Sequence, residues 1–153
     1  LMIRNHGMLK GYDTRVLGLN LRLPEINAAI ATVQMKKLPK FLKTREKNAK
    51  LLSKLLSKSN LDLPVERKNE NVNWYLYTIS TSKRNMLLKK LNAKGIGAAS
   101  YYPIPVHKTP FYKSKTKLPI TDWAASSVLS LPIHPKVTTK DIEFIAKTVS
   151  EVL

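Results

Sequence analysis

The chain has 153 residues, of which 43% are hydrophobic, and this is enough for one folded domain that buries roughly 70% of its unfolded surface. Its lack of cysteine excludes disulfides, thiolate zinc sites and a cysteine nucleophile, and no apolar run is long enough to span a bilayer, so we expect a cytoplasmic protein without a membrane partner. The formal charge of +17 raises nucleic acid as an alternative partner.

The first 23 residues predict an irregular connector, because Gly7, Gly11 and Gly18 separate short apolar pieces. Pro24 then begins a helix that Pro39 ends, and Pro39 opens a second helix that ends near Asn60. We therefore expect two helices that meet at a tight corner. The predicted division places an interdomain connector and first helix at residues 1–38 and a small domain at residues 39–153.

The second predicted helix is strongly basic, with nine Lys and Arg residues against Glu46 alone between Lys36 and Lys58. Apolar side chains recur at helical spacing, which predicts an amphipathic surface helix with solvated charges: Leu42, Ala49, Leu52 and Leu56. The sequence lacks zinc-finger spacing, leucine-zipper heptads and an RNA-recognition consensus. Nonspecific, salt-sensitive binding to nucleic acid stays open.

Strands and helices alternate in the remaining chain. An extended piece at 61–64 precedes a strand at 72–80 that places Trp74 and Leu76 on one face. Ser82 is the expected N-cap of a helix that ends at Gly95, with Met86, Leu87 and Leu91 facing inward. A second strand is expected at 96–101.

A proline-rich loop follows, and its irregular backbone is of a kind that often holds functional groups. Asp122 is the expected cap of a short helix, and a third strand covers 128–133. Thr138 and Asp141 predict a capping box for a last helix with an inward stripe: Ile142, Ile145, Val149 and Val152. The pattern indicates a compact α/β or α+β domain with a short three-stranded sheet covered by helices.

Asn20 and Arg22 stand two residues apart, directly before Pro24. A guanidinium offers a planar fork of donors suited to phosphate or carboxylate, so the pair is a candidate anion site. The alternative is that Asn20 makes turn hydrogen bonds and Arg22 is a solvated charge. Three widely separated histidines without carboxylates at ligand spacing predict no metal site.

Six stretches carry a family resemblance: Arg4-Asn5-His6-Gly7, Gly18 to Glu25, Trp74 to Tyr77, Lys94 to Gly97, Tyr101 to His107 and Leu129 to Pro135. In order and spacing the chain resembles the C-terminal part of the DegT/DnrJ/EryC1/StrS sugar aminotransferases. The resemblance covers essentially all of the chain but less than half of a complete family member. It implies the small C-terminal domain of a fold type I enzyme that uses pyridoxal phosphate.

The resemblance also implies an activity, the transfer of an amino group from glutamate to a keto sugar on a nucleoside diphosphate. In the family the lysine that binds the cofactor lies upstream of the Arg4 to Gly7 segment, so we expect no catalytic residue in this chain and no transamination by it alone. The expected partners are the N-terminal catalytic domain or a second copy in a homodimer.

Family positions supply the candidate binding residues. Asn20 and Arg22 match a segment that reaches the neighbouring subunit's site near the cofactor phosphate, although Leu19 and Leu21 stand where aromatics are common. Tyr102 and His107 flank a stiff proline stretch, and both residues would contact the sugar nucleotide. His6 is a further candidate for substrate binding.

Each of these candidates has a structural alternative. His107 could instead bond the backbone of its loop, and His6 could serve a turn. Tyr75 replaces a position often occupied by histidine. Two other functions stay open: a basic binding module with vestigial aminotransferase ancestry, and an oligomerising fragment that competes for an enzyme's dimer surface.

Overall fold

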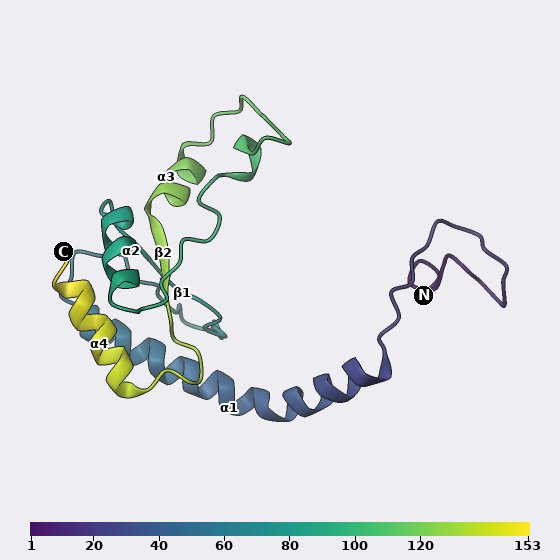
Figure 1. The fold of residues 1–153 in the computed structure, drawn as a ribbon, viewed down its shortest axis with the longest axis horizontal. Coiled ribbons are helices and arrows are strands. Elements are labelled where there is room, and N and C mark those ends of the chain that lie inside the picture. The colour runs from purple at the N-terminus through teal and green to yellow at the C-terminus, as the bar shows by residue number, and fades with distance from the viewer. The chain divides into compact units, whose positions relative to one another are not determined.

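The computed structural model describes all 153 residues, and the chain divides into two compact units, Leu1–Pro39 and Lys40–Leu153. The elements, drawn in Figure 1, follow in the order α1 (Glu25–Leu56), β1 (Tyr77–Ser80), α2 (Arg84–Ala93), a 3-10 helix (Val106–Lys108), α3 (Pro119–Ser127), β2 (Val128–Leu131) and α4 (Thr139–Ser150). The first unit contains residues 1–24 and the first part of α1. Every other element lies in the second unit.

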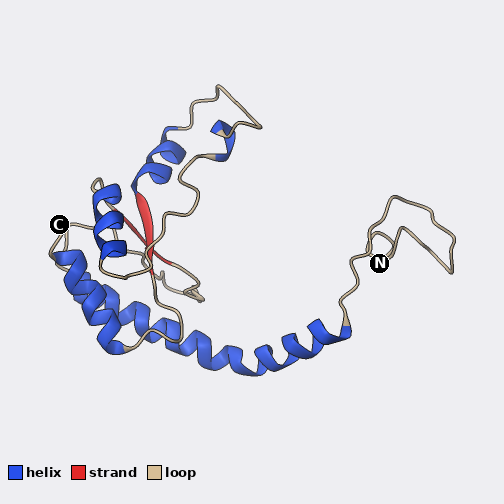
Figure 2. Cartoon of the chain, in the orientation of Figure 1, coloured by secondary structure: helices blue, strands red, loops and turns tan.

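The sheet consists of β1 and β2, which run antiparallel with Tyr77 opposite Leu131 and Ser80 opposite Val128 (Figure 2). The hydroxyls of Thr78 and Ser130 lie 2.9 Å apart across the pair. Single bridges extend the sheet on both sides, Asp62 to Ser80 and Ala99 to Ser130. The predicted mixed α and β class is confirmed by this arrangement of helices around a small sheet.

The third strand expected at 96–101 is reduced to one residue. Ala99 exchanges both backbone hydrogen bonds with Ser130, at 3.1 and 2.7 Å. Just before it the Ala98 amide donates to the Ile96 carbonyl at 2.7 Å, a three-residue turn that bends the backbone away from strand geometry. The sheet therefore has two strands and not the predicted three.

The strand expected at 72–80 begins only at Tyr77. Trp74 has a positive φ of 49°, and the Tyr75 amide donates to Asn73 Oδ1 at 2.9 Å in a local turn. This turn rotates the chain, so Trp74 is buried whereas Leu76 is exposed. Trp74 and Leu76 do not share a face, contrary to the prediction.

The hydrophobic core lies wholly within the second unit. It joins the end of α1, both strands, α2 and α4, and its fully buried members include Leu52, Leu56, Leu87, Leu91 and Ile142. The predicted inward stripe of α4 is confirmed at Ile142, Ile145 and Val149. Met86 of α2, predicted inward, is 42% exposed.

Residues 25–56 form one helix, so the predicted corner at Pro39 is wrong. Proline lacks the N–H that would bond to the Met35 carbonyl, which normally breaks or kinks a helix. Here the leucines and lysines on both sides favour the helical state and carry the helix through the missing bond. None of the helices is long and apolar enough to span a bilayer.

At α2, α3 and α4, the helix beginning agrees with the predicted sequence signal in one case of three. Thr138 and Asp141 form the predicted capping box of α4, with the Thr138 amide donating to Asp141 Oδ2 at 2.8 Å. Lys83, and not Ser82, precedes α2, because Thr81 Oγ1 accepts from the Lys83 amide at 3.2 Å and turns the chain one residue later. Helix α3 begins at Pro119, so Asp122 lies inside its first turn and is not its cap.

Candidate functional site

Two of the predicted motifs lie against one another in the first unit. The His6 amide donates to the Leu19 carbonyl at 3.1 Å, and the amides of Leu19 and Leu21 donate to the carbonyls of Ile3 and Arg4 at 2.8 and 2.9 Å. Asn5 and Asn20 face each other as an antiparallel bridge. The structure thus brings the segment that carries His6 beside the segment that carries Asn20 and Arg22.

Two glycines allow this close pairing. A Cβ on Gly7 would lie 1.7 Å from the Val16 carbonyl oxygen, and one on Gly18 would lie 1.9 Å from the Gly7 nitrogen. Gly7 also has a φ of 73°, which favours glycine. His6 precedes it with a φ of 54°, an unusual conformation for a residue with a side chain. The turn role that the sequence left open for His6 is therefore real, and it leaves the imidazole exposed.

Asn20 and Arg22 contact each other directly. Arg22 Nε donates to Asn20 Oδ1 at 3.0 Å, and both side chains are exposed. This bond uses the one acceptor of the pair, so the remaining groups, the Asn20 amide and the Arg22 terminal nitrogens, are all hydrogen-bond donors. Such a donor set beside a positive charge fits a phosphate or a carboxylate.

The loop at 101–118 carries Tyr102 and His107, and it lies in the second unit. Tyr102 is 81% exposed and has a φ of 56°. Strained backbone of this kind costs about 1–3 kcal/mol and clusters at ligand sites. Because its ring is not packed, Tyr102 has no structural reason for an aromatic side chain.

His107 lies on the 3-10 helix and is mostly covered, with 12% of its side chain exposed. Its Nε2 is 3.8 Å from Asp122 Oδ1 on α3, and Lys108 Nζ is 2.7 Å from the same oxygen. The predicted alternative, a histidine bonded to its loop backbone, does not describe the side chain, which forms no such bond. Residues within one loop and the next helix therefore form a cluster of three charged or chargeable groups.

Arg84 is a residue that sequence reasoning missed. It is 8% exposed, and its guanidinium donates to Ser100 Oγ and to the Ala125 carbonyl, the second at 3.2 Å. Ser100 Oγ in turn donates to the Val128 carbonyl at 3.1 Å. Arg84 thus links Ser100, which directly precedes the 101–118 loop, to α3, the helix that follows this loop. In a lysine-rich chain one more basic residue carries no local signal of burial.

A second missed residue, Arg45, organises the turn before β1. Its Nη1 donates to the carbonyls of Trp74 and Tyr75 at 3.2 and 2.9 Å, and its guanidinium lies 5.8 Å from the centre of the Tyr75 ring. Arg45 and Tyr75 border a cavity of about 230 Å³ that Tyr101 and His134 also line. His134 Nδ1 accepts from the Lys136 amide at 3.3 Å in the turn after β2.

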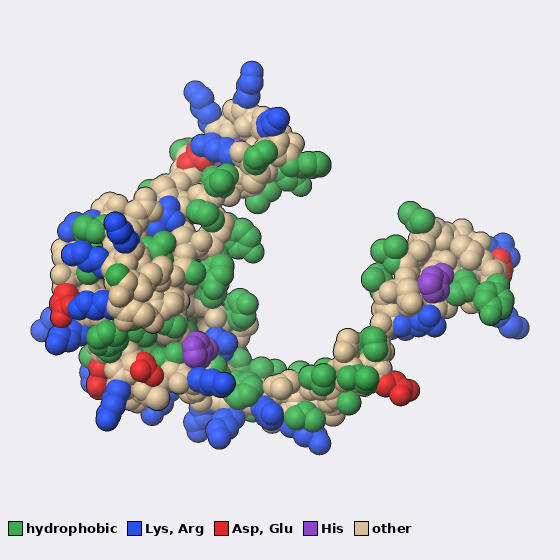
Figure 3. Space-filling view, viewed as in Figure 1, with side chains coloured by type: hydrophobic (Ala, Val, Ile, Leu, Met, Phe, Trp, Pro, Cys, Tyr) green, Lys and Arg blue, Asp and Glu red, His purple; other side chains and the backbone are tan.

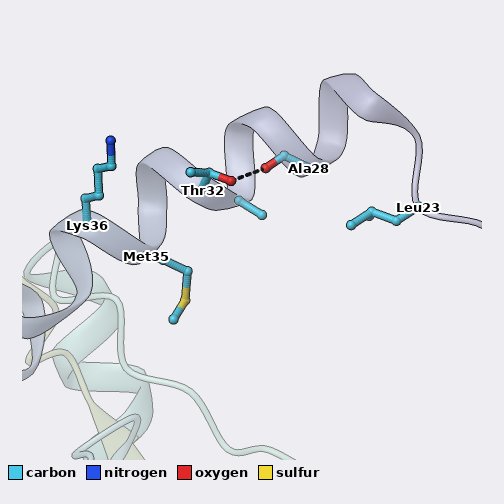
Figure 4. A pocket seen from close by; sticks show the side chains of 6 residues that line it. Leu23, Ala28, Thr32, Met35 and Lys36 are labelled. Atoms are coloured by element: carbon cyan, nitrogen blue, oxygen red, sulfur yellow. Dashed lines mark hydrogen bonds between the residues drawn. The ribbon is translucent and has the colours of Figure 1, made fainter.

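An apolar hollow of about 580 Å³ lies on the first part of α1 (Figure 4). Thr32 Oγ1 bonds back to the Ala28 carbonyl at 2.8 Å, so the helix face turned to the hollow offers few free polar groups. Exposed apolar side chains continue along this stretch: Ile26, Ile30, Val33 and Met35. None of the predicted binding residues lines the hollow, and no group of three or more His, Cys, Asp or Glu residues could hold a metal ion.

Lys and Arg side chains outnumber acidic ones on the face drawn in Figure 3. On α1, the exposed Lys50 pairs with Glu46, while Ala49, Leu52 and Leu56 are buried. The predicted amphipathic helix with a solvated basic face is therefore confirmed. Leu42, predicted in the apolar stripe, is 37% exposed.

The chain is similar to known proteins along nearly its whole length. A model of the DegT/DnrJ/EryC1/StrS aminotransferase family matches residues 1–150. A pleiotropic regulatory protein of Geobacillus stearothermophilus is 33% identical over 98% of this chain and 42% of its own length. A dTDP-3-amino-3,4,6-trideoxy-alpha-D-glucose transaminase of Streptomyces venezuelae is 34% identical over 88% of this chain and 37% of its own length.

Solved structures agree with these matches. S. venezuelae DesV in complex with a ketimine intermediate superposes with a TM-score of 0.92 and 31% identity, over 98% of this chain and 42% of that one. The chain thus spans well under half the length of the relatives and structures to which it is similar.

Proposed function

Because the chain belongs to the DegT/DnrJ/EryC1/StrS aminotransferase family, we propose that it is the C-terminal part of a nucleotide-sugar aminotransferase that uses pyridoxal phosphate. The complete enzyme transfers an amino group from glutamate to a keto sugar carried by a nucleotide. The family match over residues 1–150 is the observation that carries the proposal. The comparisons favour this function over that of a basic binding module.

Asn20 and Arg22 are the residues of this chain that fit the cofactor phosphate. Their mutual hydrogen bond of 3.0 Å holds the two side chains together and leaves only donors free. When bound, pyridoxal phosphate supplies the electron sink for amino transfer. The part of this chain is to hold the anion in place, and we propose that it does so for the active site of a partner subunit in a homodimer.

Tyr102, His107 and His6 are the proposed contacts to the sugar nucleotide. Tyr102 presents an unpacked ring on a strained backbone, and Pro103 and Pro105 restrict the loop around it. A loop that is already restricted loses less entropy when it closes on a ligand. Preorganisation is thus the physical contribution of the proline stretch to substrate binding.

The exposed apolar stretch of α1 supports the proposal of a larger enzyme. Ile26, Ile30, Val33 and Met35 lie between 49% and 75% exposed in this structure. Contiguous apolar surface of this kind marks a site that another protein surface covers. We propose that the remainder of the enzyme covers it. A cytoplasmic location and nonspecific binding of nucleic acid both stay predictions.

The experiment is an amino-transfer assay on the complete enzyme, with its N-terminal part supplied on the same polypeptide or as a second one. Arg22→Gln removes the charge of the donor set, and Arg15→Gln is the matched control, because Arg15 is an exposed arginine of the same unit that pairs with Asp13. A lost charge-assisted hydrogen bond is worth about 1.5–3 kcal/mol. We expect Arg22→Gln to raise the pyridoxal phosphate concentration for half-maximal activity about 10- to 100-fold, and Arg15→Gln to leave it unchanged.

Two results would contradict the proposal. The absence of glutamate-dependent amino transfer to any nucleotide-linked keto sugar would exclude the activity. Equal cofactor requirements of the Arg22→Gln and Arg15→Gln enzymes would exclude Arg22 as a phosphate ligand.

A further inference from the structure

His107 and Asp122 face each other across a gap slightly too long for a hydrogen bond. His107 Nε2 and Asp122 Oδ1 lie 3.8 Å apart, and both atoms are buried without a hydrogen-bond partner. A buried polar atom without a partner is costly, and a hydrogen bond between nitrogen and oxygen spans about 2.9 Å. A side-chain movement of roughly one ångström would therefore give His107 Nε2 a hydrogen-bond partner in Asp122 Oδ1.

The charge of Lys108 determines which protonation state of His107 is needed for a hydrogen bond to Asp122. Lys108 Nζ lies 2.7 Å from Asp122 Oδ1, so the two side chains form an ion pair. The ammonium already balances the charge of the carboxylate. The imidazole therefore needs only to donate one N–H to Oδ1, which the neutral ring can do.

The other ring nitrogen of His107 stays available. Nδ1 forms no hydrogen bond within the protein and does not belong to the buried atoms without a partner. In a neutral imidazole that carries its proton on Nε2, Nδ1 is an acceptor only. A phosphate oxygen cannot bond to such an atom, because neither side supplies a hydrogen, whereas a hydroxyl group can.

We propose that Asp122 is a positioning residue that fixes His107 in the Nε2–H tautomer, so that Nδ1 accepts a hydrogen bond from a hydroxyl of the substrate's sugar. This inference rests on the proposed function and deepens it, because it assigns His107 to the sugar and not to the phosphates. Asp122 itself acts through His107 and does not touch the substrate.

Arg84 supports this role by holding the two elements in register. It bonds to Ser100, directly before the loop, and to the Ala125 carbonyl, three residues after Asp122 on α3. Its guanidinium is buried, so both bonds are shielded from water. The loop and α3 therefore share a fixed support on each side of the His107 and Asp122 pair.

The test is a nitrogen-15 NMR measurement of the histidine rings in the full 153-residue chain at a pH where His107 is neutral. Wild type is compared with Asp122→Ala and with the control Asp62→Ala, which removes an exposed carboxylate of the same unit that forms no side-chain hydrogen bond or ion pair. His6 and His134 serve as internal references. We expect His107 to show the Nε2–H tautomer alone in wild type and in Asp62→Ala, and a mixture of both tautomers in Asp122→Ala.

An Nδ1–H ring at His107 in wild type, or the same tautomer ratio in wild type and Asp122→Ala, would overturn the proposal. Alanine favours the helical state of α3, so the fold should survive, and the amide signals of the core leucines report on it. If Asp122→Ala loses these signals, Asp122→Leu, which fills a similar volume without an acceptor, takes its place with the same two outcomes.

A kinetic measurement on the complete enzyme tests the ligand. Loss of one oriented hydrogen bond is expected to raise the KM for the nucleotide sugar about tenfold in Asp122→Ala, with kcat and the KM for glutamate nearly unchanged. An unchanged KM for the sugar would contradict the assignment to a sugar hydroxyl. If the wild-type enzyme does not transfer an amino group to a sugar, the proposed function is refuted, and so is the sugar hydroxyl as the ligand of His107. The tautomer measurement would still test whether Asp122 positions His107.

Discussion

The buried hydroxyl of Tyr77 makes the stability of the core depend on pH. Its side chain is fully buried, its ring stacks on Trp74 at 6.2 Å, and its hydroxyl shares a 2.8 Å hydrogen bond with Ser53. Burial raises the pKa of Tyr77 above its ordinary value, and the bond to Ser53 only partly opposes this. As the pH rises, the Tyr77 hydroxyl therefore loses its proton in the unfolded chain before it does so in the folded one. The stability that the buried, protonated Tyr77 contributes is complete below about pH 10 and is lost above it.

We predict that Tyr77→Phe lowers the free energy of unfolding by about 1 kcal/mol at pH 8, because Ser53 loses its partner. The difference between wild type and variant should shrink above about pH 10, since phenylalanine has no proton to lose. Urea denaturation at several pH values measures both effects. Tyr12→Phe is the control, because Tyr12 is 97% exposed, and a difference that does not vary with pH would contradict the argument.

At the scale of elements, α1 is the main departure from the sequence prediction. Proline ended the predicted helix because local rules consider only the lost hydrogen bond and the steric clash. In the structure the helix continues to Leu56 and buries Asn48, Ala49, Leu52 and Leu56. Asn48 adds hydrogen bonds from its side-chain amide to the carbonyls of Ile133 and Val137, at 3.4 and 3.1 Å. Packing of the second half thus helps to stabilise the helix beyond the proline.

Replacing Pro39 by alanine should restore the missing bond to the Met35 carbonyl. A proline in a helix interior costs about 3 kcal/mol relative to alanine. We therefore predict higher helix content by circular dichroism and a helix that resists heating better. Pro24→Ala is the matched control, since Pro24 precedes the helix and its absent N–H has no role there. Equal gains in both variants would show that the effect does not come from the helix interior.

At the scale of the whole molecule, the two units differ in the interactions that stabilise each of them internally. The second unit contains the complete hydrophobic core, whereas the first depends on backbone pairing and on two glycines in close approach. Exposed apolar side chains are frequent in the first unit, as at Leu17, Leu19 and Ile26. The first unit is therefore the part that gains most from coverage by other surfaces.

We predict that a fragment of residues 40–153 unfolds cooperatively in urea, with a free energy of unfolding within about 1 kcal/mol of that of the whole chain. A fragment of residues 57–153 is the control. It lacks the buried side chains of Leu52 and Leu56, each worth about 1.5–3 kcal/mol, and should not fold. Noncooperative unfolding of the 40–153 fragment would show that the first unit stabilises the core.

Much of the local structure follows from neighbouring residues alone. The capping box of α4, the end of α2 before Gly95 and the apolar stripe of the basic helix at Ala49, Leu52 and Leu56 were all predicted, because each depends on contacts within about one helical turn. Strand limits failed at Trp74 and Ile96, where turns of two or three residues interrupt an apolar pattern. Such turns leave hydrophobic periodicity unchanged, so the pattern does not show them.

For the candidate site, the sequence by itself determined the family, through the order and spacing of short motifs, and it named Asn20, Arg22, Tyr102, His107 and His6 as binding candidates, which remain predictions. Only the tertiary structure decided their partners: the pairing of the His6 segment with that of Asn20, the contact of His107 with Asp122, and the burial of Arg84. The physical reason is that a side chain's chemical type is present in the sequence. Its hydrogen-bond partner and its exposure to water depend on which distant segments fold beside it.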